Sequence, residues 1–281
     1  MIKLVTDSTS YIPQEYIEKY DISIISLSVI LNGKSTRELE IDTESFYNEM
    51  QNAQEMPTSS QPAPEEVFKT FERIIQNGDS ALGIFLSSDM SGTFSGAHIT
   101  RDLLLEKYPH AQIELLDSRT NCMQMGYAVI EAAHAASLYK SMDDIIKSAM
   151  HVITHSTFLF IPDTLTYLKK GGRIGTAASL LGNLLQIKPI LTVQNGMTTI
   201  FTKVRTKKKA IDTMVDKFLQ DINGADLGGV IVHHINCPEE GALLANNIKE
   251  KVHIDVTIQC IGPVIGLHVG PGCVGIAYYT K

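Results

Sequence analysis

Tryptophan is absent from this chain of 281 residues, and cysteine is scarce: the four cysteines, at positions 122, 237, 260 and 273, form no Cys-x-x-Cys pair. This spacing argues against a disulfide framework, and we expect reduced, mostly buried thiols. No apolar run approaches the roughly 20 residues that a membrane-spanning helix needs. Met1–Asp7 is already strand-like, which leaves no room for a signal peptide. We therefore expect a cytoplasmic protein.

Basic side chains are the minority, 24 against 31 acidic ones, and the formal net charge is −7. This balance argues against a surface that binds nucleic acid as a whole. Hydrophobic residues make up 44% of the chain, which is typical of a globular protein with a substantial core.

Motifs of nucleotide-binding and hydrolytic enzymes are also missing. There is no Gly-x-x-x-x-Gly-Lys-Ser/Thr loop, and no Gly-x-Ser-x-Gly elbow that would present Ser91 as a nucleophile. Gly270–Gly275 matches the Gly-x-Gly-x-x-Gly string, but only six residues follow it, too few for a βαβ unit. We interpret this string as a tight turn with close backbone approach. His233 and His234 are neighbours on a predicted strand and face opposite sides, which favours structural roles over a metal site.

Short apolar runs alternate with amphipathic helical stretches in the first half of the chain. This pattern predicts an α/β domain with a parallel sheet covered by helices. Asn32-Gly33 is a tight-turn signal. The expected strands are 2–6, 22–31, 81–86 and 113–116, and the expected helices begin at Pro13, near Thr43 and at Pro64, the last of them ending at Asn77-Gly78.

The second half differs, because Asn195-Gly196 is a hairpin signature between two strand-like runs. This change predicts two domains, 1–155 and 156–281, the second being α/β with a mixed sheet. Its expected strands are 158–161, 187–193, 197–204, 230–234, 255–261 and 275–280, and its expected helices are 164–170 and 238–251.

Two segments rich in hydroxyl side chains, Thr58–Pro62 and Ser87–Thr93, each precede a predicted helix. Hydroxyls and free backbone N–H groups at helix starts are what a buried carboxylate or phosphate needs. Two other predicted strands end in Asp7–Ser10 and Asp117–Thr120, and the carboxyl ends of the strands line the ligand crevice of an open α/β sheet. Such residues are also common in turns and caps, but three strand ends of this kind on one rim favour an anion site.

Basic residues concentrate in two places in this acidic chain. They occupy five of the seven positions from 203 to 209, and Lys169, Lys170 and Arg173 follow a predicted helix. A run of this kind is often a solvated helix face. It is equally suited to docking an acidic partner or a phosphorylated group.

Taken in order, these segments resemble the DegV family over essentially the whole chain. Any one of the motifs is weak, but seven in order are specific. The matching segments are Asp7–Ser10, Thr58–Pro62, Ser87–Thr93, Asp117-Ser118, Leu168–Ile174, Ile187–Leu191 and His268–Gly272.

The resemblance implies two α/β domains that hold one long-chain fatty acid, such as palmitate, stearate or oleate, in the cleft between them. In the members called FakB, the protein presents that acid to a separate fatty acid kinase subunit, which makes an acyl phosphate for phospholipid synthesis. We therefore expect no catalysis by the chain itself and no cofactor or metal, and we allow for transient contact with a membrane.

Carried over by position, Ser59, Ser91 and His268 would hold the carboxylate, and Arg173 and Arg205 would face the kinase. Ser59 replaces a usual threonine and keeps the hydroxyl. Thr58, Ser60, Gly92 and Thr93 complete the expected head-group site. The stretch Arg119–Met123 departs from the serine-rich sequence usual in relatives.

The acyl tail should dominate affinity, because burying each CH₂ contributes about 0.8 kcal/mol, while the hydroxyls set direction. Candidate tunnel residues, which are equally suited to an ordinary core, are Phe158, Phe160, Ile161, Leu165, Leu180, Leu181, Leu184 and Leu185. Two alternatives remain open. One is an enzyme, either a serine-dependent acyl hydrolase or a small-molecule transferase. The other is a regulatory module whose acyl occupancy changes its affinity for another protein.

Overall fold

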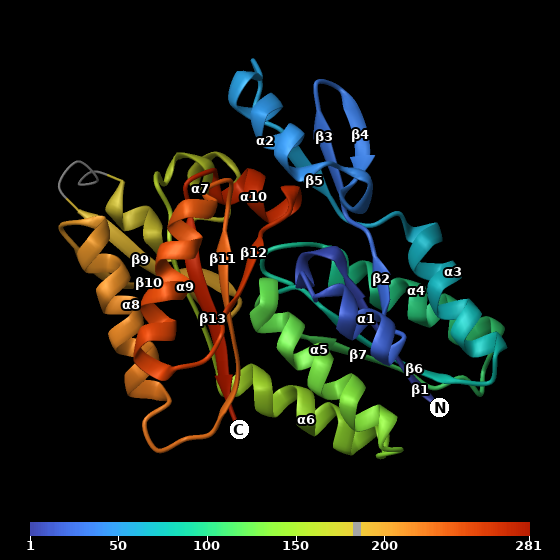
Figure 1. The fold of residues 1–281 in the computed structure, drawn as a ribbon. Helices are drawn as coiled ribbons and strands as arrows, with labels where there is room; N and C mark the ends of the chain where they lie inside the picture. The colour runs from blue at the N-terminus through green and yellow to red at the C-terminus, as the bar shows by residue number, and fades with distance from the viewer. Residues whose placement is uncertain (182–186) are drawn as a thin grey trace.

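A computed structural model describes residues 1–181 and 187–281 (Figure 1). The first half contains a parallel sheet in the order β2-β1-β6-β7, which confirms the predicted parallel α/β arrangement. Its strands are β1 (Ile2–Asp7), β2 (Ser23–Ile25), β6 (Ser80–Phe85) and β7 (Ile113–Asp117). Because all of these strands are parallel, their carboxyl ends meet at one edge, as expected from the sequence.

Helices cover both faces of this sheet. They are α1 (Gln14–Tyr20), α3 (Pro64–Gln76), α4 (Thr93–Lys107), α5 (Cys122–Ser137) and α6 (Met142–Thr154). Helix α3 has proline in its first turn and ends at Asn77-Gly78, where Gly78 has a φ of +78°, as the sequence predicts. The most buried helix is α5, which lies between the two halves of the molecule and contacts both β1 and β13 (Val274–Thr280).

A small antiparallel sheet, in the order β4-β3-β5, was not expected. It consists of β3 (Ser28–Leu31), β4 (Lys34–Arg37) and β5 (Thr58–Ser60), with α2 (Thr43–Asn52) inserted before β5. The extended run predicted at 22–31 is therefore two strands, separated at Ser26-Leu27, that belong to different sheets. Thr58–Ser60, predicted as part of a turn, is an edge strand paired with β3. Asn32 and Gly33 both have positive φ, which confirms the predicted tight turn.

The second half contains a six-stranded mixed sheet in the order β10-β9-β8-β13-β11-β12, as predicted for its class. Strands β11 and β12 are parallel, and the other neighbouring pairs are antiparallel. Besides β13, the strands are β8 (Ser156–Ile161), β9 (Lys188–Gln194), β10 (Met197–Val204), β11 (Leu227–His234) and β12 (Thr257–Cys260). The helices are α7 (Thr166–Lys170), α8 (Lys207–Asp221), α9 (Pro238–Val252) and α10 (Pro263–Val269).

The two faces of the six-stranded sheet have different neighbours. On the outer face, Leu159 and Ile161 belong to a core cluster with α8 and α9. On the inner face, Phe158 and Phe160 belong to a second cluster that also contains Leu82 of β6, so apolar packing is continuous between the halves. Figure 1 shows the small sheet and α2 above this junction, beside α10. The domain boundary at residues 155 and 156 stays a prediction, which the change of sheet after α6 supports.

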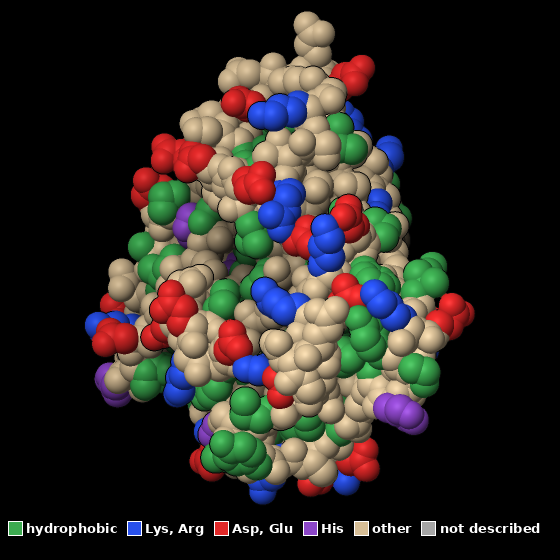
Figure 2. All heavy atoms as spheres, turned by 90° about the vertical axis from the view of Figure 1, so that its right-hand side faces the viewer, with side chains coloured by type: hydrophobic (Ala, Val, Ile, Leu, Met, Phe, Trp, Pro, Cys, Tyr) green, Lys and Arg blue, Asp and Glu red, His purple; other side chains and the backbone are tan. Residues whose placement is uncertain are grey.

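Charges of both signs are interspersed on the face formed by the first half (Figure 2). Several are paired along and between α3 and α4, including Lys69 with Glu65 at 2.6 Å and Lys107 with Glu72 at 2.8 Å. Within residues 1–181 and 187–281, no helix is long and apolar enough to cross a membrane.

Candidate functional site

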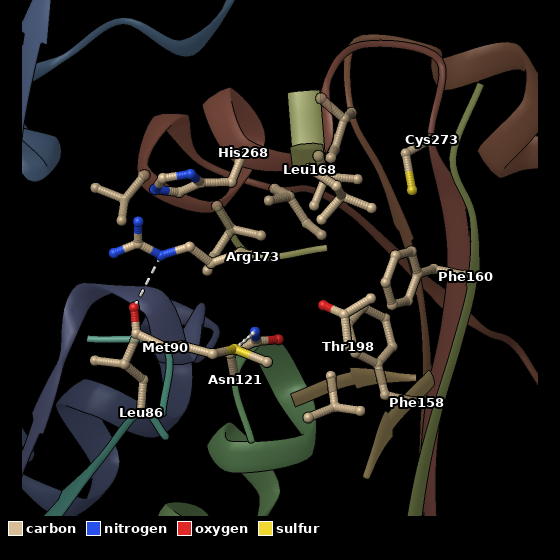
Figure 3. A pocket seen from close by; sticks show the side chains of 16 residues that line it. Leu86, Met90, Asn121, Phe158, Phe160, Leu168, Arg173, Thr198, His268 and Cys273 are labelled. Atoms are coloured by element: carbon tan, nitrogen blue, oxygen red, sulfur yellow. Dashed lines mark hydrogen bonds between the residues drawn. The ribbon is translucent and has the colours of Figure 1, made fainter. Parts of the chain in front are cut away.

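A cavity lies where the two halves meet (Figure 3). Its walls are mostly apolar, and its polar members come from four separate segments of the chain. The lining residues are Leu86, Met90, Asn121, Phe158, Phe160, Leu168, Arg173, Val193, Thr198, Ile235, Ile261, Val264, Ile265, His268, Val269 and Cys273. This composition suits a ligand with a long apolar part and a few polar groups.

Strand β8 supplies the aromatic wall. The rings of Phe158 and Phe160 stack with centroids 5.2 Å apart, and both line the cavity, as the sequence suggested. Ile161 cannot do so, because alternate residues of a strand face opposite sides and it packs against the outer helices. Leu165 and Leu180 are buried core residues, and Leu181 is 36% exposed. Leu184 and Leu185 lie outside the described residues.

His268 and Ser59 meet at one end of this cavity. The Ser59 hydroxyl lies 2.8 Å from His268 Nε2, although the two residues are 209 positions apart in the chain. His268 Nδ1 is buried without a hydrogen-bond partner in the described part of the chain. Burial, reinforced by the nearby positive charge of Arg173, lowers the pKa of His268 to about 4. The imidazole is therefore neutral at pH 7 and carries one proton, on either ring nitrogen.

Two glycines place His268. A Cβ on Gly171 would lie 2.3 Å from His268 Nδ1, so α7 can end beside the imidazole only because this position has no side chain. Gly270 ends α10 with a φ of +90°, and a Cβ there would lie 2.2 Å from the Tyr167 ring. The close backbone approach predicted for the Gly270–Gly275 string is confirmed.

Arg173 lies beside His268 and bridges the two halves. Its Nε donates to the Met90 carbonyl at 3.1 Å (Figure 3), and its Nη1 donates to the Gly171 carbonyl at 2.7 Å. Its guanidinium is exposed and also lines the cavity. A cation at this point favours an anion at the same end of the cavity.

The two hydroxyl-rich segments lie next to each other. A Cβ on Gly92, at the start of α4, would lie only 2.7 Å from Gln61 Oε1. Ser91 follows the cavity residue Met90, and its hydroxyl is 2.9 Å from that of the buried Thr93. Thr58 and Ser60 flank Ser59 on β5 and face the opposite side of that strand.

The other strand ends hold the rim together instead of lining the cavity. Asp7 is fully buried and accepts hydrogen bonds from the backbone N–H groups of Thr9 and Leu86, at 2.9 and 2.8 Å. Burial outweighs these bonds and raises its pKa to about 6. Ser118 is also fully buried, and its hydroxyl donates to the Thr120 carbonyl.

The start of α10 is fixed by the first half of the chain. Glu38, which is 5% exposed, accepts from the Val264 N–H at 2.9 Å and the Tyr11 hydroxyl at 3.0 Å. The Tyr47 hydroxyl donates to the Ile261 carbonyl at 2.8 Å. Glu38 and Tyr47 were missed in the sequence, because nothing in the local pattern around either residue indicates a partner more than 200 positions away.

The remaining candidates lie elsewhere. Arg205 is exposed in the turn between β10 and α8 and is not among the cavity-lining residues. His233 Nε2 accepts from the Met123 N–H at 3.4 Å, and His234 Nδ1 accepts from the Cys237 N–H at 3.3 Å. Within residues 1–181 and 187–281, no group of three or more His, Cys, Asp or Glu side chains is arranged to hold a metal ion.

Comparison with known proteins finds a family whose model matches the whole chain. Residues 1–281 match a family model described as "Uncharacterised protein, DegV family". A DegV domain-containing protein of Clostridium acetobutylicum is 52% identical over 280 residues, which cover 100% of this chain and 98% of that protein.

Solved structures are similar over the same length. DegV of Bacillus subtilis, described as a fatty acid binding protein, is 34% identical with a TM-score of 0.89, covering 100% of this chain and 99% of that one. A stearic acid-binding protein of Eubacterium ventriosum is 25% identical with a TM-score of 0.91 and the same coverage, 100% and 99%.

Proposed function

Because the chain belongs to the DegV family, we propose that it binds one long-chain fatty acid, such as palmitate, stearate or oleate, in the cavity between its two sheets. The observation that carries this proposal is the form of the cavity: walls of Phe, Leu, Ile and Val, with a serine–histidine pair and an arginine at one end. Solved relatives described as fatty-acid-binding proteins support it.

The carboxylate would lie at the end where Ser59, His268 and Arg173 converge. If His268 carries its proton on Nε2, it donates to the Ser59 oxygen, and the Ser59 hydroxyl proton is free for the carboxylate. Ser91 would supply a second hydroxyl from the adjoining turn, supported by Gly92 and Thr93. The exposed guanidinium of Arg173 adds positive charge, and charge-assisted hydrogen bonds each contribute about 1.5–3 kcal/mol.

The tail would supply most of the affinity. Burial of each CH₂ contributes about 0.8 kcal/mol, or on the order of 10 kcal/mol for a long chain, part of which offsets the entropy lost on binding. Phe158 and Phe160 form the wall along which the chain would lie.

Lipid extracted from the purified protein and identified by mass spectrometry tests this proposal. Wild type should yield stoichiometric long-chain fatty acid, and Ser59→Ala and Ser91→Ala should retain less. Ser137→Ala, at the exposed end of α5 opposite to the end that carries the cavity residue Asn121, is the matched control and should retain as much as wild type. No acyl chain in the wild-type protein, and no binding of added stearate or oleate, would refute it.

We further propose that the bound acid is presented to a fatty acid kinase subunit, with Arg173 and Arg205 on the contact surface, for acyl-phosphate formation. Both guanidiniums are exposed, and the cavity opens beside Arg173. Arg205→Ala is the cleaner test because this residue does not line the cavity. Kinase-dependent acyl phosphate should fall while lipid content stays, whereas unchanged acyl phosphate would contradict the proposal.

One observation favours a second candidate, an acyl hydrolase. Ser59 and His268 have the spacing of a nucleophile and its base. Against it, the pKa of His268 is lowered to about 4, which makes a poor base, and Nδ1 faces Gly171 instead of an orienting carboxylate. Release of fatty acid from acyl esters by the isolated chain, abolished in Ser59→Ala, would establish hydrolysis. We expect no turnover.

A further inference from the structure

Asn121 lies at the cavity wall, and the hydrogen bonding of its side chain is unusual for its position in the helix. It is the N-cap residue of α5, where an asparagine side chain ordinarily accepts a hydrogen bond from the first turn of the helix. Here it makes no such bond. The Met123 N–H of that turn instead donates to His233 Nε2 from the opposite sheet. The Asn121 side chain therefore takes no part in capping the helix and borders the cavity instead.

The orientation of the Asn121 amide is fixed by Met90. The amide Nδ2 lies 3.1 Å from Met90 Sδ, a sulfur that accepts but cannot donate. Rotating the amide would place its oxygen against that sulfur with no donor, so the nitrogen belongs on the Met90 side. Oδ1 then points into the cavity (Figure 3), where it is buried without a partner in the part of the chain that the structure describes.

Thr198 presents a second polar group to the same space. It is 5% exposed and Asn121 is 7% exposed, and both line the cavity. Figure 3 shows the Thr198 hydroxyl directed toward the Asn121 side of the cavity, with Phe158 beside it. The two residues come from opposite halves of the molecule, α5 and β10. Between apolar walls, an acceptor and a hydroxyl that face one space form a polar site for a group that can both donate and accept.

A plain hydrocarbon chain cannot satisfy this site, because it leaves the Asn121 oxygen buried and unpaired. A keto group fails for the same reason, since it accepts but does not donate. A hydroxyl satisfies both residues, donating to Asn121 Oδ1 and accepting from Thr198. We propose that this cavity selects long-chain fatty acids that carry a hydroxyl group along the chain. This inference rests on the fatty-acid binding proposed above.

The test compares affinities for stearic acid, a set of hydroxystearic acids with the hydroxyl moved along the middle of the chain, and the matching oxostearic acids. Wild type should prefer at least one hydroxy isomer over stearic acid by roughly tenfold, the usual effect of pairing one buried acceptor, and should not prefer the oxo acid. The readout is the ratio of the affinity for the preferred hydroxystearic acid to the affinity for stearic acid. This ratio cancels any general effect of a substitution on the binding of the acyl chain.

Two variants connect that ratio to the site. In Asn121→Leu, which keeps similar volume without the acceptor, the ratio should fall to near one. In Thr198→Val, which keeps the shape without the hydroxyl, it should fall severalfold, and this variant keeps the test valid if Asn121→Leu does not fold. Wild type that binds stearic acid and every hydroxy isomer equally would overturn this inference alone, whereas wild type that binds none of the acids would overturn the proposed function as well.

Discussion

The absence of a side chain at position 171 decides where His268 can lie. Gly171 has ordinary right-handed helical dihedrals, so alanine is allowed there by the backbone, yet its Cβ would lie 2.3 Å from His268 Nδ1. The imidazole would have to move, and its contact with Ser59 would be lost. We expect Gly171→Ala to weaken fatty acid binding about tenfold, the loss of roughly one charge-assisted hydrogen bond, as measured by calorimetry.

The next glycine provides the control for this prediction. Gly172 has a φ of +70°, and a Cβ added there would meet no atom within 4 Å, so Gly172→Ala strains the backbone without touching His268. It should cost about 1 kcal/mol of stability and leave affinity near the wild-type value. Equal losses of affinity in the two variants would mean that Gly171 acts through general stability and not through the imidazole.

His233 makes the folded protein sensitive to acid. Burial lowers its pKa from 6.5 to about 4, so between these values the unfolded chain holds a proton that the folded protein does not. Stability therefore rises with pH across that window, and acid removes up to about 3 kcal/mol through this one group.

His233→Gln removes the titration, and its side-chain oxygen can accept the Met123 N–H in place of Nε2. Urea unfolding at a series of pH values from 7 to 4.5 should show a shallower loss of stability in this variant than in wild type. Buried Asp7, with its pKa raised to about 6, acts in the opposite direction, but it does so equally in both proteins. The exposed His110→Gln is the control, and a slope in His233→Gln as steep as in this control would contradict the prediction.

At the scale of elements, helix α10 carries His268 but is held in place by the first half of the chain. The Glu38 carboxylate accepts hydrogen bonds from the N–H of Val264, in the first turn of α10, and from the hydroxyls of Tyr11 and Ser8. Burial raises the pKa of this carboxyl. Glu38→Ala would leave these buried donors without an acceptor. We expect the free energy of unfolding to fall by about 2–4 kcal/mol. We also expect faster amide exchange across 263–269, as measured by hydrogen-exchange mass spectrometry.

Glu40→Ala is the matched control for Glu38→Ala. This carboxylate lies two residues away and is 58% exposed in a surface ion pair with Arg37. Its loss should cost well under about 1 kcal/mol and leave exchange in α10 unchanged. If amide exchange in α10 is as slow in Glu38→Ala as in wild type, other contacts hold this helix.

Most elements could be predicted because their signals are local. Periodicity and turn residues located the strands of both sheets, the Asn195-Gly196 hairpin and the proline start of α3. The small β4-β3-β5 sheet could not be predicted, because pairing of β3 with Thr58–Ser60 depends on contacts across about thirty residues of intervening chain. The run at 22–31 looked continuous for the same reason, since its division at Ser26-Leu27 is imposed by bonds to Ser8 and Glu66.

The candidate site could be proposed from the sequence only in part. Ser59, Ser91 and His268 came from the order of motifs and not from spacing, since no periodicity indicates a contact across 209 positions. Thr198 gave no signal, because it is a common strand residue. Asn121 lies in the stretch Arg119–Met123 that departs from relatives, but as a common cap residue it did not stand out within that stretch. Only their burial against one cavity distinguishes them.

At the scale of the molecule, the two sheets are joined around the cavity by polar contacts as well as apolar packing. The Ser87 hydroxyl donates to the Gly196 carbonyl at 2.7 Å, and Arg119 donates to the Asn195 carbonyl at 2.6 Å, so the hairpin of one sheet is bonded to the rim of the other. With Arg173 on Met90 and Glu38 on Val264, these contacts surround the space in which we place the ligand.

The central claim is that this space holds a fatty acid with its carboxylate at Ser59 and His268. A crystal structure of the protein with stearic acid tests it most directly. The account predicts a carboxylate within hydrogen-bonding distance of the Ser59 hydroxyl and an acyl chain lying along Phe158 and Phe160. A carboxylate at the opposite end of the cavity, or an acyl chain bound elsewhere on the molecule, would contradict it.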